Sequence, residues 1–222
     1  MRYHIVTIFP QMFDSYFSES ILARAQKSKK IKITVYDLRT FSKDKHRKVD
    51  DKPYGGGPGM VMTVDPIVRA VEKIQSKISN RTKRSVAQEK PKTLVVLFTP
   101  EQTNFTTKLA KEYARDYTDI IMVCGRYEGV DARVREVLGA VELSIGNYVL
   151  TGGEIPAMIL VDCVSRQIEG VLGDFESLEE SRASSHDVYT RPAVYTHKGA
   201  GYQVPEVLQN GNHKEIDKWR TK

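Results

Sequence analysis

Apolar residues in the first 170 positions follow two patterns that alternate along the chain. Short runs that are almost entirely apolar predict strands, at 3–9, 32–38, 93–100 and 119–125. Between them, apolar residues recur at helical spacing and predict helices, at 12–28, 65–78, 105–116 and 156–168. Strands of this kind are typical of parallel sheets covered on both faces, so the alternation predicts an α/β fold with a parallel sheet.

The pattern changes after residue 170. Residues 174–180 contain four acidic residues and show no apolar periodicity, which predicts a mobile interdomain linker over 171–187. Beyond it, two short helical segments separated by "NGN" predict a small helical domain over 188–222. The main domain is expected to cover residues 1–170.

Composition limits the class of protein. No apolar run approaches the ~20 residues that a membrane span needs, and the N-terminus predicts a strand rather than a signal peptide. Cys124 and Cys163 lie in apolar runs, which predicts buried free thiols and a reducing environment. We therefore expect a cytoplasmic protein with no membrane partner.

Positive charge is concentrated in two clusters. The net charge is +6, and residues 73–92 alone carry seven Lys or Arg against one Glu. A second cluster, "KDKHRK", covers 43–48. Such clusters can be ordinary solvated surface, but two of them in a chain of pI about 9.2 make a polyanion the leading candidate partner.

Three glycine-rich segments are candidates for binding, at 50–62, 125–134 and 144–158. None ends in the Gly-Lys-Ser/Thr of a phosphate-binding loop, so a nucleoside triphosphate is disfavoured. A dehydrogenase is also disfavoured, because "TIFPQMF" after the first strand contains no glycine. Taken alone, 50–62 can be a flexible loop, and the spacing in 144–158 favours a β-hairpin with Asn147 at its turn.

Together these segments resemble one family. "DDKPYGGGPGM", "CGRYEGVD" and "SIGNYVLTGGEIPAM", in this order, are similar to motifs of the bacterial tRNA (guanine-N1)-methyltransferases of the TrmD family. "YTRP" at 189–192 and "VPEVLQNGNHKEIDKWR" at 204–220 resemble its C-terminal domain. The resemblance implies a SPOUT fold with a deep C-terminal trefoil knot in the main domain. It also implies a homodimer whose active sites are shared between subunits, and transfer of a methyl group to N1 of the guanine 3′ of the tRNA anticodon.

The resemblance implies that S-adenosylmethionine is the cofactor. This molecule carries an adenine and a cationic sulfonium but no phosphate, which suits glycine backbone, an aromatic ring and a carboxylate. The implied cofactor-binding residues are Phe98, Thr99, Pro100, Gly125, Tyr127, Glu128, Ile145, Gly146, Asn147, Tyr148, Val149, Leu150, Gly152, Gly153 and Pro156. Side chains at Gly125, Gly152 or Gly153 are expected to take the space of the cofactor or to oppose a positive φ.

The resemblance also implies catalytic residues. Arg166 corresponds to an arginine that stabilises negative charge on the guanine O6, and Glu180 of "EES" stands where the family has its general base, contributed by the partner subunit. The segment after Ser181 is shorter than in the family, so Asp187 and Glu179 are alternatives for the base.

The implied RNA contacts come from both domains. They are Lys45, Arg47, Lys48, Asp50, Arg191, Lys218 and Arg220. The resemblance suggests Mg²⁺, although no residues with metal-ligand spacing are predicted. Two other functions stay open on the sequence alone: a SPOUT-type RNA methyltransferase of other site specificity, and a non-catalytic protein that binds structured RNA.

Overall fold

The protein consists of two units, which are described separately. The computed structural model describes residues 1–83, 91–172 and 187–220. Its compact units are Met1–Leu172 and Gly173–Lys222. The boundary falls within the predicted linker, most of which, 173–186, lies outside the described residues.

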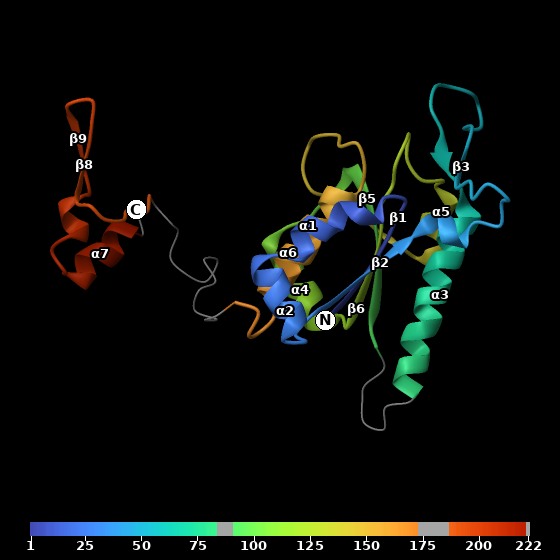
Figure 1. The fold of residues 1–222 in the computed structure, drawn as a ribbon, viewed down its shortest axis with the longest axis horizontal. Coiled ribbons are helices and arrows are strands. Elements are labelled where there is room, and N and C mark those ends of the chain that lie inside the picture. Colours follow the sequence, from blue (N-terminus) through green and yellow to red (C-terminus); the bar gives the residue numbers. More distant parts are fainter. Residues whose placement is uncertain (84–90, 173–186, 221–222) are drawn as a thin grey trace. The chain divides into compact units, whose positions relative to one another are not determined.

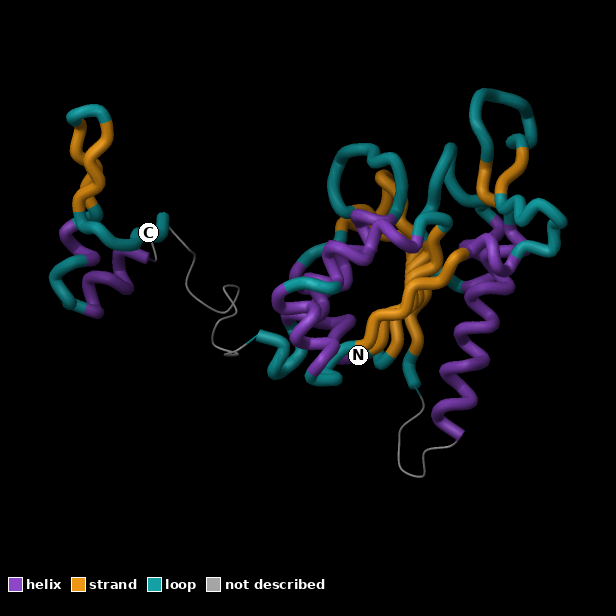
Figure 2. The backbone as a smooth tube through the Cα atoms, viewed as in Figure 1, coloured by secondary structure: helices purple, strands orange, loops and turns teal. Residues whose placement is uncertain are grey.

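A five-stranded parallel sheet forms the centre of the first unit, in the order β2-β1-β6-β5-β7 (Figure 2). The predicted α/β fold with a parallel sheet is thereby confirmed. The strands are β1 (Arg2–Thr7), β2 (Lys32–Asp37), β5 (Thr93–Asn104), β6 (Asp119–Val123) and β7 (Val141–Ser144). Every residue of β6 is buried, which explains why its sequence shows a continuous apolar run and not an alternation.

Helices cover both faces of this sheet, as Figure 1 shows. One core joins the sheet to α1 (Asp14–Phe17), α2 (Ser20–Lys27), α4 (Thr107–Asp116) and α6 (Glu154–Arg166). The other core joins it to α3 (Val64–Lys83) and α5 (Arg133–Leu138). On the first face Phe13 and Leu160 are almost fully buried, and on the second Ile67 and Ile74 are fully buried. The helical spacing of apolar residues thus marks the sides that pack on the sheet.

Short elements complete the first unit. The helical character predicted over 12–28 is confirmed, but this segment is divided into a 3₁₀ turn, η1 (Pro10–Phe13), followed by α1 and α2. Ser20 has a φ of +50°, which breaks the helix before α2. A second 3₁₀ turn, η2 (Leu38–Phe41), follows β2. The two-residue strands β3 (Asp50–Asp51) and β4 (Val61–Met62) pair in an antiparallel hairpin that the sequence analysis did not predict.

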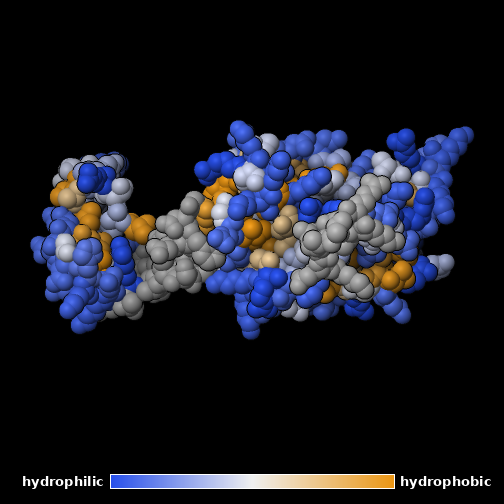
Figure 3. All heavy atoms as spheres, turned by 90° about the horizontal axis from the view of Figure 1, so that it is seen from below, coloured by the Kyte–Doolittle hydropathy of each residue, from blue (hydrophilic) through white to orange (hydrophobic). Residues whose placement is uncertain are grey.

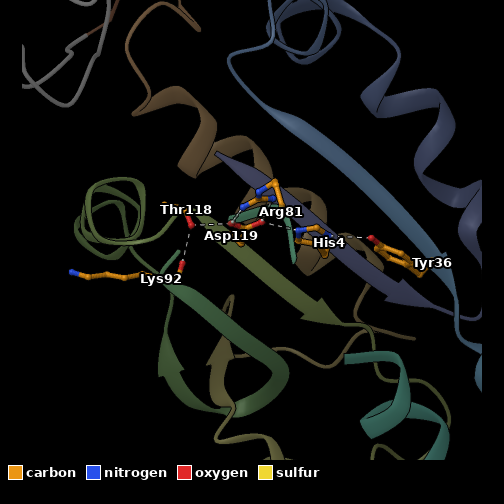
Figure 4. A network of polar contacts seen from close by, with 6 residues as sticks. All are labelled: His4, Tyr36, Arg81, Lys92, Thr118 and Asp119. Atoms are coloured by element: carbon orange, nitrogen blue, oxygen red, sulfur yellow. Dashed lines mark hydrogen bonds and ion pairs between the residues drawn. The ribbon is translucent and has the colours of Figure 1, made fainter. Parts of the chain in front are cut away.

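A buried polar network fixes the C-terminal part of α3 to the amino ends of the strands (Figure 4). Asp119, at the start of β6, is fully buried and accepts two hydrogen bonds from Arg81 of α3, at 2.7 and 3.1 Å. His4 Nε2 lies 3.0 Å from the same carboxylate, and Thr118 donates to it at 2.8 Å. Burial raises the pKa of Asp119, but the hydrogen bonds from His4, Arg81 and Thr118 outweigh it and hold the pKa well below its usual range.

The second unit is small and exposed. Its antiparallel hairpin, β8 (Val194–His197) and β9 (Ala200–Gln203), precedes a 3₁₀ turn, η5 (Glu206–Leu208), and helix α7 (His213–Arg220). The prediction of a purely helical domain missed this hairpin. Lys198 and Gly199 both have positive φ, as a two-residue type I′ hairpin turn requires.

The surface combines charged and apolar areas. Figure 3 shows apolar side chains between hydrophilic ones on the face that it draws. Among the described helices, none is long and apolar enough to cross a membrane.

Candidate functional site

A cleft of about 440 Å³ lies at the carboxyl ends of β5, β6 and β7. The segments that follow these three strands form its walls. Ligands of open α/β sheets bind at this edge, where loops with free backbone groups converge. The volume is within the range of about 300–1,000 Å³ that small-molecule and cofactor sites occupy.

An interruption in β5 shapes the first wall. The register between β5 and β7 shifts between Phe98 and Thr103, which both pair with Leu143, so the residues between them form a bulge in the strand. Ser144 holds this bulge, because its hydroxyl donates to the Pro100 carbonyl oxygen at 3.1 Å. Phe98, Thr99 and Pro100 therefore face the cleft as one irregular segment.

The loop after β6 forms the second wall and adjoins the hairpin β3–β4. The Met62 amide donates to the Gly129 carbonyl oxygen at 2.9 Å, and the Glu128 amide donates to the Met60 carbonyl oxygen at 3.0 Å. Tyr127 has a φ of +60°, a left-handed conformation that is strained for a bulky residue and is often found at functional sites. Its ring is half exposed at the cleft.

Arg126 joins this loop to the start of α6. Its Nε donates to Oε2 of Glu154 at 2.9 Å, and Thr7 at the end of β1 donates to the other oxygen of that carboxylate at 2.7 Å. Glu154 is only 1% exposed, so this ion pair is largely shielded from water. Arg126 also donates to the Thr151 carbonyl oxygen at 3.2 Å. Three segments distant in sequence are thereby fixed at one corner of the cleft.

The third wall, residues 144–153, is an irregular loop. The β-hairpin that spacing favoured here is wrong, since no strand follows β7 before α6 in this fully described stretch. The Gly153 amide donates to the Gly125 carbonyl oxygen at 3.0 Å, which brings the third wall against the second. A Cβ atom at Gly153 would lie 2.8 Å from the Cys124 Cα atom.

The glycines of the cleft are therefore needed for reasons that differ from those predicted. None of Gly125, Gly152 and Gly153 has a positive φ. A Cβ at Gly152 would overlap the Arg126 side chain, whereas one at Gly125 would lie 3.2 Å from Val130. Gly152 and Gly153 thus permit close packing of the protein on itself, and a Cβ at Gly125 would require a small shift of the Val130 side chain.

The structure brings the predicted cofactor residues together, with one exception. Fourteen of the fifteen line the cleft, while Asn147 is exposed and does not. The sequence analysis missed twelve further lining residues, Leu97, Val123, Arg126, Gly129, Val130, Asp131, Ala132, Arg135, Glu142, Leu143, Ser144 and Thr151. Most adjoin the predicted motifs in sequence, so extending each motif by a few residues would have included them.

Charge in the cleft favours a cation and disfavours phosphate. Both lining arginines are paired, Arg126 with Glu154 and Arg135 with Glu142, the latter at 3.0 Å. Within the described residues, Glu128 has no ion-pair partner. A lining that combines apolar side chains, backbone amides and a free carboxylate fits the adenine and sulfonium of S-adenosylmethionine.

The predicted catalytic residues do not line this cleft. Arg166 is the last residue of α6, and Pro156 at the other end of the helix borders the cleft. At the rise of an α-helix these two residues are separated by roughly 15 Å along the axis. Glu179 and Glu180 lie outside the described residues, and Asp187 is exposed in the second unit.

The predicted RNA contacts lie in both units. Lys45, Arg47 and Lys48 are exposed in the loop before β3, and Asp50 is the first residue of that strand. Arg191, Lys218 and Arg220 are exposed in the second unit. The described part of the 73–92 cluster begins within α3. This helix runs from the cleft side of the sheet to the amino edge of the sheet, as Figure 1 shows. The charges of the cluster therefore lie toward the end of α3 that is remote from the cleft.

Comparison with known proteins identifies the family of this chain. All of residues 1–222 match the tRNA (guanine-1)-methyltransferase TrmD family. The chain belongs to this family. A tRNA (guanine-N(1)-)-methyltransferase of Desulforamulus reducens is 45% identical over 99% of this chain and 82% of that relative. The corresponding protein of Clostridioides difficile is 43% identical over 99% of this chain and 90% of its own length.

A solved structure supports the same assignment to the TrmD family. The crystal structure of the tRNA (m1G37) methyltransferase from Aquifex aeolicus is 35% identical, with a TM-score of 0.77. It matches 100% of this chain, which covers 88% of that protein. The likeness therefore extends over both units.

Proposed function

We propose that this protein transfers a methyl group from S-adenosylmethionine to N1 of guanine 37, the nucleotide 3′ of the anticodon in tRNA. The observation that carries the proposal is the match of the whole chain to the TrmD family, whose motifs form one cleft at the carboxyl edge of the sheet. The proposed domains of this chain are a catalytic domain over 1–170, a linker over 171–187 and a tRNA-binding domain over 188–222.

Residues of the cleft would hold S-adenosylmethionine, which supplies an electrophilic methyl group. The backbone around Gly125 and the loop 145–150 would enclose the adenine, and Tyr127 offers a ring for stacking. Glu128 would attract the sulfonium, because its carboxylate lacks an ion-pair partner among the described residues. Arg126 orients these walls through Glu154.

The target nitrogen imposes a proton transfer. Guanine N1 carries a proton, which a carboxylate would accept as the N1–methyl bond forms, and negative charge would develop on O6. The bond between the methyl group and the sulfonium sulfur would break in the same step, with neutral S-adenosylhomocysteine as the leaving group. In the proposed mechanism Glu180, with Asp187 or Glu179 as alternatives, accepts the proton, and the guanidinium of Arg166 stabilises the charge on O6. Removal of either group should act on the chemical step and leave cofactor affinity unchanged.

We propose a homodimer in which each active site takes its arginine and its general base from different subunits, with Arg166 of the partner subunit beside the cleft and Glu180 from the chain that forms the cleft. The distance along α6 supports this arrangement, since Arg166 is remote from the cleft of its own chain. An exposed apolar area beside the cleft supports it too: Phe9 and Met12 are each 41% exposed, and Ile155 is 49% exposed. The Arg126 guanidinium lies 4.7 Å from the Phe9 ring centroid, which links this area to the cleft.

Further properties follow from the proposed family role. We infer a deep trefoil knot in the C-terminal part of the main domain, supported by the backbone contact between Gly153 and Gly125. Free cysteines and a tRNA substrate support a cytoplasmic location. Mg²⁺ stays a prediction from the resemblance, and no cluster of three or more possible metal ligands occurs in the described part of the chain.

Two measurements together test the activity. Calorimetry should detect S-adenosylmethionine binding, and labelled methyl groups should pass from it to a tRNA transcript but not to an unrelated structured RNA. A protein that binds RNA without catalysis would show no binding of S-adenosylmethionine. Methylation of the unrelated RNA, with none of the tRNA, would instead favour a SPOUT-type methyltransferase of other specificity.

A further inference from the structure

The tip of the hairpin β3–β4 presents a large aromatic side chain that contributes nothing to the core. Tyr54 is 100% exposed. It occupies a turn in which the Gly56 amide donates to the Pro53 carbonyl oxygen at 3.3 Å. Gly55 follows with a φ of +85°, as the third position of a type II turn requires. The turn therefore directs the ring of Tyr54 into solvent, and folding does not explain an aromatic residue there.

This tip is attached to the wall of the cleft. The backbone bonds from Met62 to Gly129 and from Glu128 to Met60 join the base of the hairpin to the loop after β6. Gly59 approaches Glu128 so closely that a Cβ at Gly59 would lie 2.5 Å from the Glu128 Cγ atom. Since Glu128 and Gly129 line the cleft, the base of the hairpin that carries Tyr54 is attached to the cleft wall.

Basic residues lie close to this aromatic tip in the sequence. Lys52 is exposed two positions before Tyr54 in the sequence. The exposed Lys45, Arg47 and Lys48 precede the same hairpin. An exposed ring among cations is the combination by which proteins bind unpaired nucleotides, through base stacking and phosphate neutralisation.

We propose that Tyr54 stacks on an unpaired base of the tRNA anticodon loop that adjoins the target guanine. The inference rests on the proposed function. An enzyme that acts on N1 must take its guanine out of the stack, and the neighbouring base then loses a stacking partner. Tyr54 replaces that partner, which makes it a residue that positions the substrate and takes no part in the chemistry.

Steady-state kinetics with tRNA test this role in the full-length protein. Tyr54→Ala should lower kcat/KM for tRNA about 10-fold, the scale of one base–aromatic stack. Tyr54→Phe keeps the ring and should stay close to wild type. Val137→Ala is the control, because it shortens another exposed apolar side chain, 60% exposed on α5, and should change nothing. Cofactor affinity by calorimetry and dimer content by sedimentation should be equal in all four proteins.

Several results would overturn the assignment. If Tyr54→Ala keeps the kcat/KM of the wild type, the ring makes no contact with the tRNA that matters for catalysis. If Tyr54→Phe loses as much kcat/KM as Tyr54→Ala, the effect belongs to the hydroxyl and not to the ring. A parallel loss of cofactor affinity, or of dimers, would give Tyr54 a structural role or a second copy of this chain as its partner. Failure of the wild-type protein to methylate any tRNA would refute the proposed function itself, and this inference with it.

Discussion

Gly153 and Gly125 face the same cleft but are expected to respond differently to substitution. Gly153→Ala forces a Cβ to within 2.8 Å of the Cys124 Cα atom, and backbone cannot move aside as a side chain can. We expect it to lower the free energy of unfolding by about 1–3 kcal/mol, the usual cost of overpacking, and to weaken cofactor binding. Gly125→Ala meets only the Val130 side chain and is the control, with a smaller loss of stability in denaturant titrations. Equal stability losses would contradict the packing account.

Some residues of the cleft could be predicted from the sequence and others could not. The motif residues that line the cleft could be predicted, because the resemblance gave them as contiguous segments. The ion pair between Arg126 and Glu154 could not, since the two residues are 28 positions apart and only the folded loops bring them together. Asn147 was assigned to the cleft with its neighbours, but the irregular loop exposes it.

At the scale of elements, the contact between Asp119 and Arg81 should anchor α3. Asp119→Asn removes the charge that pairs with Arg81, whose side chain is 36% exposed. We expect a loss of about 2–3 kcal/mol at neutral pH, less than for a fully buried pair because water reaches the arginine. The control is Asp116→Asn, whose pair with Arg115 is exposed on both sides and should contribute little. Equal effects of the two substitutions would refute the anchoring role.

The same contact predicts a dependence of stability on pH. The folded-state pKa of Asp119 is depressed, so its stabilisation is complete above about 4, the ordinary pKa of aspartate, and declines as pH falls below it. The difference in unfolding free energy between wild type and Asp119→Asn should therefore shrink in acid. A difference that is constant from neutral pH to pH about 3 would contradict this assignment.

Strands and helices with a regular spacing of apolar residues could be predicted from the sequence, but breaks within them and short hairpins could not. The four strands predicted from apolar runs all occur, with ends shifted by up to four residues. The break at Ser20 depends on a left-handed backbone that the spacing does not reveal. The hairpin β3–β4 was missed because strands of two residues are too short to leave an alternating pattern, and β8–β9 was missed because both of its strands are exposed throughout.

At the scale of the whole molecule, mixed dimers test whether active sites are shared. Arg166→Ala should lower kcat about 100-fold or more, as loss of a charge-stabilising group does. Gly125→Leu should fill the cleft and abolish cofactor binding. If Arg166 of the partner subunit completes each cleft, a dimer of the two variants keeps one complete site, and mixing should restore activity. Mixed dimers that form but stay inactive would place Arg166 in the mechanism of its own chain.

The most direct test of the central claim is to locate the transferred methyl group. Wild-type protein, S-adenosylmethionine and a tRNA transcript would be incubated, and the digested tRNA analysed by mass spectrometry. The account predicts 1-methylguanine at position 37, and no product from the same transcript with adenine at that position. A methyl group on another nucleotide, on another atom of guanine 37, or no transfer by protein that binds the cofactor would contradict it.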